Sequence, residues 1–134
     1  MNEDIRWKQR FDNYTYAIKL LEQAINLKNL DIFQQAGMIQ FFEMCSELSW
    51  KLMKDYLEEH GFNDLNTPRG AIKQAFNSGI IKDGHSWMEL LSDRNLTSHI
   101  YNEAISQQII ELIRNKYYPM FQDLFVIFNE FKNA

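Results

Sequence analysis

The residues of this sequence with the clearest capacity for chemistry lie together between Ser92 and Asn102. Within eight positions the segment carries an arginine, an amide, two hydroxyls, a histidine and a tyrosine, namely Arg94, Asn95, Thr97, Ser98, His99 and Tyr101. Arginine offers a permanent charge in a planar fork that matches a phosphate group. Histidine titrates near neutrality and can accept or donate a proton. Without a metal ion, these two groups can help a ribose 2′-hydroxyl attack its neighbouring phosphodiester, because one removes the proton while the other stabilises charge in the transition state.

The spacing of Arg94 and His99 sets a condition on this hypothesis. The two residues are five positions apart, and neighbours on a helix are three or four positions apart. We therefore expect the two side chains to converge only if a helix ends between them and the chain turns back. Spacing alone favours a plainer alternative, in which Arg94 forms a surface ion pair and His99 is a capping or core residue.

A second group of polar residues forms a narrow stripe on an otherwise apolar segment between about residues 31 and 59. Within it, Glu47 and Lys51 have the spacing of a helical ion pair. The stripe is either a solvated face or the lining of a cleft. In the second case we expect four residues to line that cleft: Glu43, Glu47, Lys51 and Ser98.

The elements that must position these residues are helices. Apolar residues recur every three or four positions along nearly the whole chain, which is typical of helices, and no strand-like alternation, repeat or linker is found in the sequence. Helices are expected over residues 7–25, 31–59, 68–78, 83–96 and 103–131. The segment 31–59 is apolar on most sides and is expected to be central. We predict a single all-α domain over residues 1–134, built as an antiparallel bundle.

Capping signals refine the helix ends. Thr67 followed by Pro68 opens the third helix, which is short and is expected to pack outside the main bundle. Ser86 and Glu89 have the spacing of a capping box at the start of the fourth helix. Pro119 removes a backbone hydrogen bond inside the last helix and is expected to kink it.

The composition is that of a folded protein of a reducing compartment. Of the 134 residues, 46% are hydrophobic and 24% are charged. The one cysteine, Cys45, lies in an apolar stretch and is expected to be a buried, inert thiol. The first residues are charged where a signal peptide needs an apolar run, and no stretch approaches the roughly 18 apolar residues of a membrane span. We expect a cytoplasmic protein without a membrane segment.

Charge and aromatic content bear on the partners. The net charge of −4 means that any contact with RNA needs a local cluster of cations. The last helix carries more rings than one narrow stripe can bury, which favours a homodimer or another partner: Tyr117, Tyr118, Phe121, Phe125, Phe128 and Phe131.

Other site classes lack their sequence patterns. His60, His85 and His99 include no pair at metal-ligand spacing, and Cys45 is far from all three. The five glycines are scattered, so there is no glycine-rich phosphate loop. We expect neither a bound metal ion nor a cofactor.

The segment from Arg94 to Tyr101 resembles the Arg-polar-x-x-x-His signature of the HEPN superfamily, in its extended Arg-x4-His-x-Tyr form. That form is typical of the HEPN partner in two-gene modules with a minimal nucleotidyltransferase, proteins described as nucleotidyltransferase substrate-binding proteins or HepT-type toxins. Three further stretches are similar to that group: residues 42–57, 67–69 and 81–87. The resemblance covers nearly the whole chain.

The resemblance implies a fold and a function. The fold would be an up-and-down four-helix bundle with one short extra helix, usually dimeric, with the motif near the dimer cleft. Arg94 and His99 would be catalytic in a metal-independent RNase, and Asn95 would assist them. A nucleotidyltransferase encoded nearby would silence the RNase by adenylylating Tyr101. Two alternatives stay open: a non-catalytic substrate-binding subunit of that enzyme, and a helical interaction protein whose polar segment only fixes a dimer. For Tyr101 the alternative to an adenylyl acceptor is a packing residue with a wet hydroxyl.

Overall fold

The computed structural model describes the backbone of residues 2–134 and the side chains of residues 5–134. All of its regular elements are helical, in the order α1 (Asn2–Ile25), α2 (Ile32–Glu59), α3 (Pro68–Asn77), α4 (Gly84–Asp93), a 3₁₀ helix (Arg94–His99), α5 (Glu103–Leu112), a π-helical turn (Ile113–Tyr117) and α6 (Tyr118–Asn133). The predicted all-α class is confirmed.

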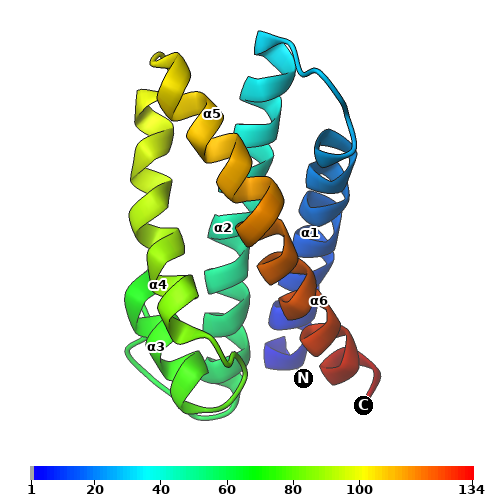
Figure 1. Cartoon of the computed structure of the whole chain (residues 1–134). Coiled ribbons are helices and arrows are strands. Elements are labelled where there is room, and N and C mark those ends of the chain that lie inside the picture. Colours follow the sequence, from blue (N-terminus) through cyan, green and yellow to red (C-terminus); the bar gives the residue numbers. More distant parts are fainter. Residues whose placement is uncertain (1) are drawn as a thin grey trace.

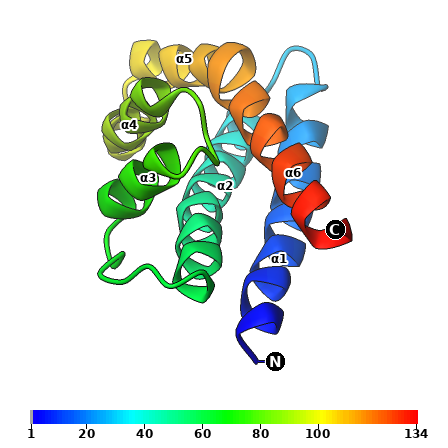
Figure 2. The same cartoon turned by 90° about the horizontal axis from the view of Figure 1, so that it is seen from below.

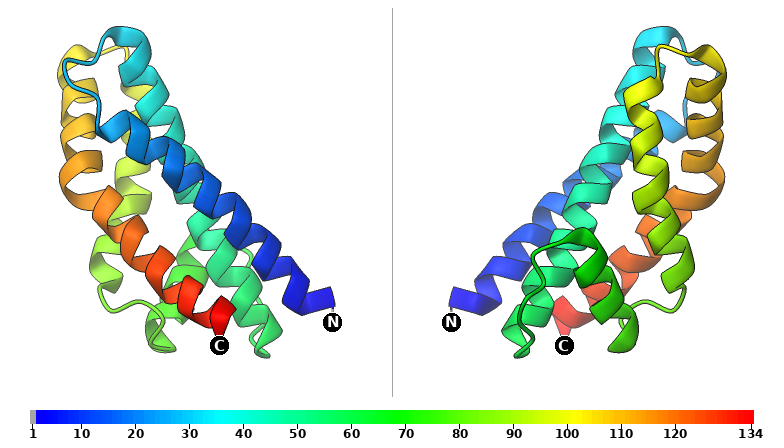
Figure 3. Two further views of the ribbon diagram at one scale, coloured as in Figure 1. Left: turned by 90° about the vertical axis from the view of Figure 1, so that its right-hand side faces the viewer. Right: turned by 90° about the vertical axis from the view of Figure 1, so that its left-hand side faces the viewer.

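The long helices run up and down (Figure 1). α1 and α2 form an antiparallel pair, α4 returns in the opposite direction to α2, and α5 and α6 descend as one bent rod, so that both termini lie at the same end of the bundle. α3 lies outside this set, against α2 and α4, as the view from below shows (Figure 2). The bent rod crosses from α4 to α1, and α6 packs against α1 (Figure 3).

Aromatic side chains of α6 pack mainly within the chain. Phe121 and Phe128 are fully buried, and the Phe125 ring stacks on the Phe11 ring of α1 at 5.4 Å between centroids. Phe131 stacks on Tyr56 of α2 at 4.7 Å. The aromatic rings that the sequence analysis counted as too many to bury are therefore covered largely by α1 and α2 of the same chain. They give no argument for a dimer.

Capping residues place the helix starts largely as expected. Thr67 caps α3 by accepting a hydrogen bond from the Gly70 amide. The expected capping box at Ser86 and Glu89 is wrong, because Asp83 is the cap and its carboxylate accepts hydrogen bonds from the amide and the hydroxyl of Ser86. A carboxylate three residues earlier can satisfy both donors, so Glu89 is left for another partner.

The bend in the last helix has its local cause just before Pro119. A π-helical turn spans Ile113–Tyr117, and α6 begins at Tyr118 with Pro119 in its first turn. A proline ring clashes with the carbonyl four residues earlier, and an extra residue in the preceding turn moves that carbonyl away. The expected kink is thus spread over a wider turn.

A buried ion pair between Arg10 of α1 and Asp55 of α2 should contribute to stability. Arg10 Nε lies 2.9 Å from Asp55 Oδ2, and the Asp55 side chain is only 1% exposed. Arg10→Ala leaves a buried carboxylate without a partner, so we expect a loss of about 2–4 kcal/mol in the free energy of unfolding measured with urea. Lys132→Ala, which breaks an exposed pair with Asp12, should cost less than about 1 kcal/mol. Equal losses would contradict this assignment.

Candidate functional site

The segment that carries Arg94 and His99 does not end the helix between them. α4 ends at Asp93, and the chain continues directly as a 3₁₀ helix from Arg94 to His99. The reversal comes afterwards, at 100–102, where Asn102 caps α5 through a hydrogen bond from the Ile105 amide. The turn that the spacing argument required between the two residues is therefore found beyond them.

This geometry separates Arg94 and His99 within one chain. A 3₁₀ helix has three residues per turn, so positions three apart lie on the same face. Arg94 shares its face with Thr97, whose hydroxyl donates to the Arg94 carbonyl, and His99 shares its face with Leu96. The two side chains thus leave different faces of the same helix, and they do not share a pocket in a single chain.

Arg94 is held by Glu47 of α2. Its Nη1 donates to Glu47 Oε2 at 3.2 Å, and the Arg94 side chain is 29% exposed. Trp50 Nε1 donates to the same carboxylate oxygen at 3.2 Å, and Lys51 Nζ lies 3.0 Å from the other oxygen. The predicted ion pair between Glu47 and Lys51 is therefore present, and it belongs to a wider network that orients the guanidinium.

The network also sets the charge of Glu47. Burial alone would raise the pKa of this carboxyl, but hydrogen bonds from Lys51, Trp50 and Arg94, together with the Lys51 charge, hold its pKa below the usual value. Glu47 is therefore ionised at neutral pH and compensates one of the two cations beside it. Arg94 keeps further donors that are not used by Glu47, since a guanidinium carries five.

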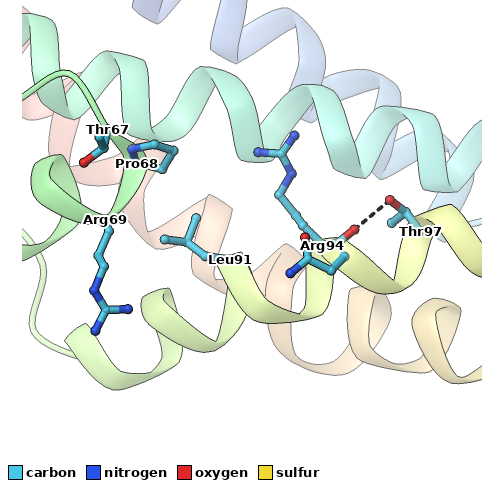
Figure 4. A pocket seen from close by; sticks show the side chains of 7 residues that line it. Thr67, Pro68, Arg69, Leu91, Arg94 and Thr97 are labelled. Carbon is cyan, nitrogen blue, oxygen red and sulfur yellow. Dashed lines mark hydrogen bonds between the residues drawn. The ribbon is translucent and has the colours of Figure 1, made fainter.

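An open pocket lies beside Arg94. It has a volume of about 320 Å³ and is lined by Thr67, Pro68, Arg69, Leu91, Arg94, Asn95 and Thr97. In Figure 4 the Arg94 side chain reaches toward α2, the Arg69 side chain points away from α2, and Leu91 lies between them. Arg69 makes no ion pair with any side chain in the range 5–134. The pocket therefore has an arginine on either side of Leu91, and the two guanidinium groups point in opposite directions (Figure 4).

Sequence reasoning did not single out Arg69 as a site residue. The signal that could have found it is the Thr67-Pro68 cap, which fixes Arg69 in the first turn of α3. That α3 packs beside α4 is a tertiary contact, and nothing in the local sequence specifies it.

His99 and Tyr101 form a separate pair at the surface. His99 Nδ1 lies 3.2 Å from the Tyr101 hydroxyl oxygen, and the two rings meet edge to face with centroids 5.8 Å apart. Tyr101 is 83% exposed, so the structure does not show it as a packing residue. A phenol beside an imidazole nitrogen can pass its proton to that nitrogen, which would make the phenol oxygen a nucleophile.

Two contacts from the π-helical turn hold the end of α4 that precedes Arg94. The Tyr117 hydroxyl donates a hydrogen bond to Asp93, and Lys116 Nζ lies 2.6 Å from Glu89 Oε1. Burial and the Asp93 carboxylate raise the pKa of Tyr117 far above its usual value, so it remains a donor. The extra residue of the π turn sets the directions in which the Lys116 and Tyr117 side chains leave the helix. The sequence analysis did not predict this turn.

The remaining predicted lining residues contribute less. Ser98 is exposed, and its hydroxyl donates to the Asn95 carbonyl. Glu43 lies one helical turn before Glu47 on α2 and is half-buried. The Arg94 guanidinium donates its hydrogen bond to Glu47, and not to Ser98 or Glu43. Their assignment to a cleft stays a prediction.

Other classes of site have little support. Among the described side chains, those of residues 5–134, no three His, Cys, Asp or Glu side chains come together in a way that could hold a metal ion. No helix within residues 2–134 is long and apolar enough to cross a bilayer. Burial raises the pKa of the Cys45 thiol to about 12, which confirms the expected inert, buried cysteine.

An up-and-down helical bundle with a polar Arg-to-Tyr segment after its fourth helix defines the class of this protein. The chain belongs to the family described as "Nucleotidyltransferase substrate binding protein like", whose sequence profile matches residues 9–129. The resemblance stated from the motif is therefore confirmed at the level of the family.

Two relatives are informative. Over 78 residues the chain is 35% identical to "Probable ribonuclease HepT" of Haemophilus influenzae, and the match covers 51% of this chain and 49% of that protein. The chain thus matches about half the length of that curated relative. A crystal structure of a protein from Thermus thermophilus superposes with a TM-score of 0.75 at 26% identity, over 83% of this chain and 94% of that chain.

The charge of Glu47 gives a test of the network. Because the pKa of Glu47 is lowered in the folded state, the ionised carboxylate stabilises the fold above its usual pKa of about 4.3. This contribution is lost as the pH falls through the lowered pKa. At pH 7 we expect Glu47→Gln to lower the free energy of unfolding by up to about 1 kcal/mol, and the difference from the unsubstituted protein to shrink in urea titrations as the pH falls below the usual pKa of a glutamate. Glu43→Gln should cost less at pH 7, and a difference for Glu47→Gln that is independent of pH would refute the assignment.

Proposed function

We propose that this protein is the HEPN subunit of a two-gene HEPN–nucleotidyltransferase module, that it cleaves RNA without a metal ion, and that adenylylation of Tyr101 controls it. One observation carries the proposal: a single 3₁₀ helix presents Arg94 beside an open pocket and His99 at the surface next to an exposed tyrosine. The membership in the family and the similarity to a protein named as a probable ribonuclease support the same interpretation.

The cleavage step assigns one role to each group. The imidazole of His99 takes the proton of a ribose 2′-hydroxyl, whose oxygen attacks the adjacent phosphorus. The phosphorus–O5′ bond breaks, the 5′-oxygen takes up a proton, and the product strand ends in a 2′,3′-cyclic phosphate. Arg94 stabilises the extra charge on the phosphorane-like transition state, and the Asn95 amide adds a hydrogen bond.

The separation of Arg94 and His99 within one chain makes the site a composite of two copies. His99 is exposed, and the side chain that it meets in its own chain is that of Tyr101. A two-fold dimer in which the His99 of each copy approaches the Arg94 of the other satisfies the geometry. It also gathers the Arg69 and Arg94 side chains of both copies on an acidic protein.

The RNase activity is tested with the purified protein and single-stranded RNA in the presence of EDTA. We expect cleavage, and a loss of at least about 100-fold for His99→Ala, which is the lower limit for a general base. His85→Ala removes an exposed histidine of α4 and should leave the rate unchanged. Cleavage that requires a divalent metal ion, or that persists without His99, would refute the proposal.

Mixing two inactive variants tests the composite site. In a mixed dimer of Arg94→Ala and His99→Ala, one of the two sites combines an intact arginine with an intact histidine. An equimolar mixture that exchanges subunits should recover about a quarter of the original activity, because half of the dimers are mixed and each has one intact site. No recovery in a mixture shown to contain mixed dimers would place both residues in one chain.

Adenylylation of Tyr101 is tested by intact-mass spectrometry after co-expression with the neighbouring nucleotidyltransferase. We expect added mass equal to one or more adenylyl groups, its loss in Tyr101→Phe, and its retention in Tyr16→Phe, since Tyr16 is 63% exposed but lies on α1. The modified protein should not cleave RNA, because the new phosphate lies beside His99. Equal modification of the Tyr101→Phe protein would contradict the assignment of the acceptor.

A second function is favoured by the pocket between Arg69 and Arg94. Its lining includes two arginines, two threonines and an asparagine, residue types that suit an anionic substrate, and a subunit that only presents such a substrate to the nucleotidyltransferase needs no His99 chemistry. That function predicts a stable complex with the enzyme and loss of substrate binding in Arg69→Ala, with no cleavage of RNA by any form of the protein.

A further inference from the structure

A groove runs along Tyr101, with a lining that shares no residue with the Arg94 pocket. It has a volume of about 630 Å³ and is lined by Ile32, Gln35, Ala36, Ile39, Ile100, Tyr101, Glu103 and Ser106. We call it the Tyr101 groove. It lies between the start of α2 and the start of α5, at the end of the bundle opposite the termini (Figure 1). Its volume falls in the range of sites that bind small organic ligands, about 300–1,000 Å³.

The walls of the Tyr101 groove are apolar and partly uncovered. Ile32 is 74% exposed and Ile100 is 38% exposed, while Ile39 is buried at the base. Aliphatic side chains on two facing elements suit a flat ring that inserts between them. Exposed apolar side chains that gather around a depression indicate that a ligand or partner covers them.

Ser106 supplies a hydroxyl to the wall of the groove. It is only 7% exposed and lines the groove, and its hydroxyl is not one of the fully buried polar atoms that lack a partner in the described part of the chain. The Gln35 amide, in contrast, is committed, because its nitrogen donates to the Leu30 carbonyl and its oxygen faces Gln107. A hydroxyl in the wall of a groove can donate a hydrogen bond to a ligand that enters the groove.

We propose that the Tyr101 groove binds the nucleoside of an adenylyl group attached to Tyr101. This inference rests on the proposed modification of Tyr101. Because Tyr101 itself lines the groove, a nucleotide on its hydroxyl is tethered at the opening and enters at high effective concentration. The adenine ring lies between Ile32, Ile39 and Ile100, and one of its ring nitrogens accepts the hydrogen bond of the Ser106 hydroxyl.

The chemistry of attachment determines whether the base or the phosphate of the adenylyl group enters the Tyr101 groove. The phenol oxygen of Tyr101 attacks the α-phosphorus of ATP, a new oxygen–phosphorus bond forms, and pyrophosphate leaves. The phenolic proton passes to His99 Nδ1, 3.2 Å away. The resulting phosphodiester carries one negative charge, which Glu103 in the groove repels. The neutral base therefore enters the groove while the phosphate stays beside His99.

This arrangement explains how a single modification can silence the site. The seated nucleoside holds the phosphate next to His99, in the place that the scissile phosphate of RNA must occupy. A freely mobile adenylyl group would compete less effectively with the substrate, because it would spend part of its time in solvent.

Methyl spectroscopy of the adenylylated protein tests the proposal. The protein is labelled at its isoleucine δ1 methyl groups and co-expressed with the nucleotidyltransferase, and intact mass first establishes the modification. We expect ring-current shifts to high field for Ile32, Ile39 and Ile100, and no shift for Ile5 and Ile127 on α1 and α6. The Tyr101→Phe protein, treated in the same way, should show none of these shifts.

A filled groove provides the second variant. Ala36→Phe places a ring in the groove from the exposed face of α2, so the protein should be adenylylated to the same extent without the three methyl shifts. Its phosphodiester bond should also be cut several-fold faster by an added phosphodiesterase. If the unsubstituted protein gains mass but shows no methyl shifts, the nucleoside does not bind in the groove, although Tyr101 is still modified. No added mass overturns both.

Discussion

The candidate site depends on one contact between distant parts of the chain, the ion pair of Arg94 with Glu47. Glu47 lies in the middle of the central helix and is fixed by Trp50 and Lys51 of the same helix. Its carboxylate therefore offers a rigid acceptor to the guanidinium of Arg94, the first residue after α4. Without it, the guanidinium would be a flexible surface charge. Because the end of α4 lies near α2, the Arg94 side chain is held in one orientation before any ligand binds.

The 3₁₀ helix after α4 decides what one chain can do alone. Its three-residue repeat puts Arg94 and Thr97 on one face and His99 on another, so under the proposed function one copy would supply two half-sites rather than one complete site. The same segment then ends in an exposed pair of His99 and Tyr101. Cleavage and its control by modification would therefore share one histidine, which makes the two states mutually exclusive.

Helix type and most helix ends could be predicted because they depend on local physics. The period of apolar residues identifies the helices, and Thr67 with Pro68 marks the start of α3 as the structure has it. The fourth helix was expected to begin near Asp83 or Ser86 because both are good caps, and only the observed hydrogen bonds show that Asp83 is the cap. The π turn before Pro119 was not predicted. Its Lys116 and Tyr117 side chains contact α4, and such tertiary contacts are not visible in the local sequence.

The sequence by itself determined the all-helical class and the family, because the motif from Arg94 to Tyr101 and the apolar periodicity are both local in the chain, and the motif also supplied the proposed site residues. The tertiary structure decided which of these residues meet. Glu47 and Arg94 are 47 positions apart, and Arg69 lines the pocket beside Arg94 only because α3 packs against α4. Such contacts depend on how helices pack, and no local pattern encodes the packing of one helix against another.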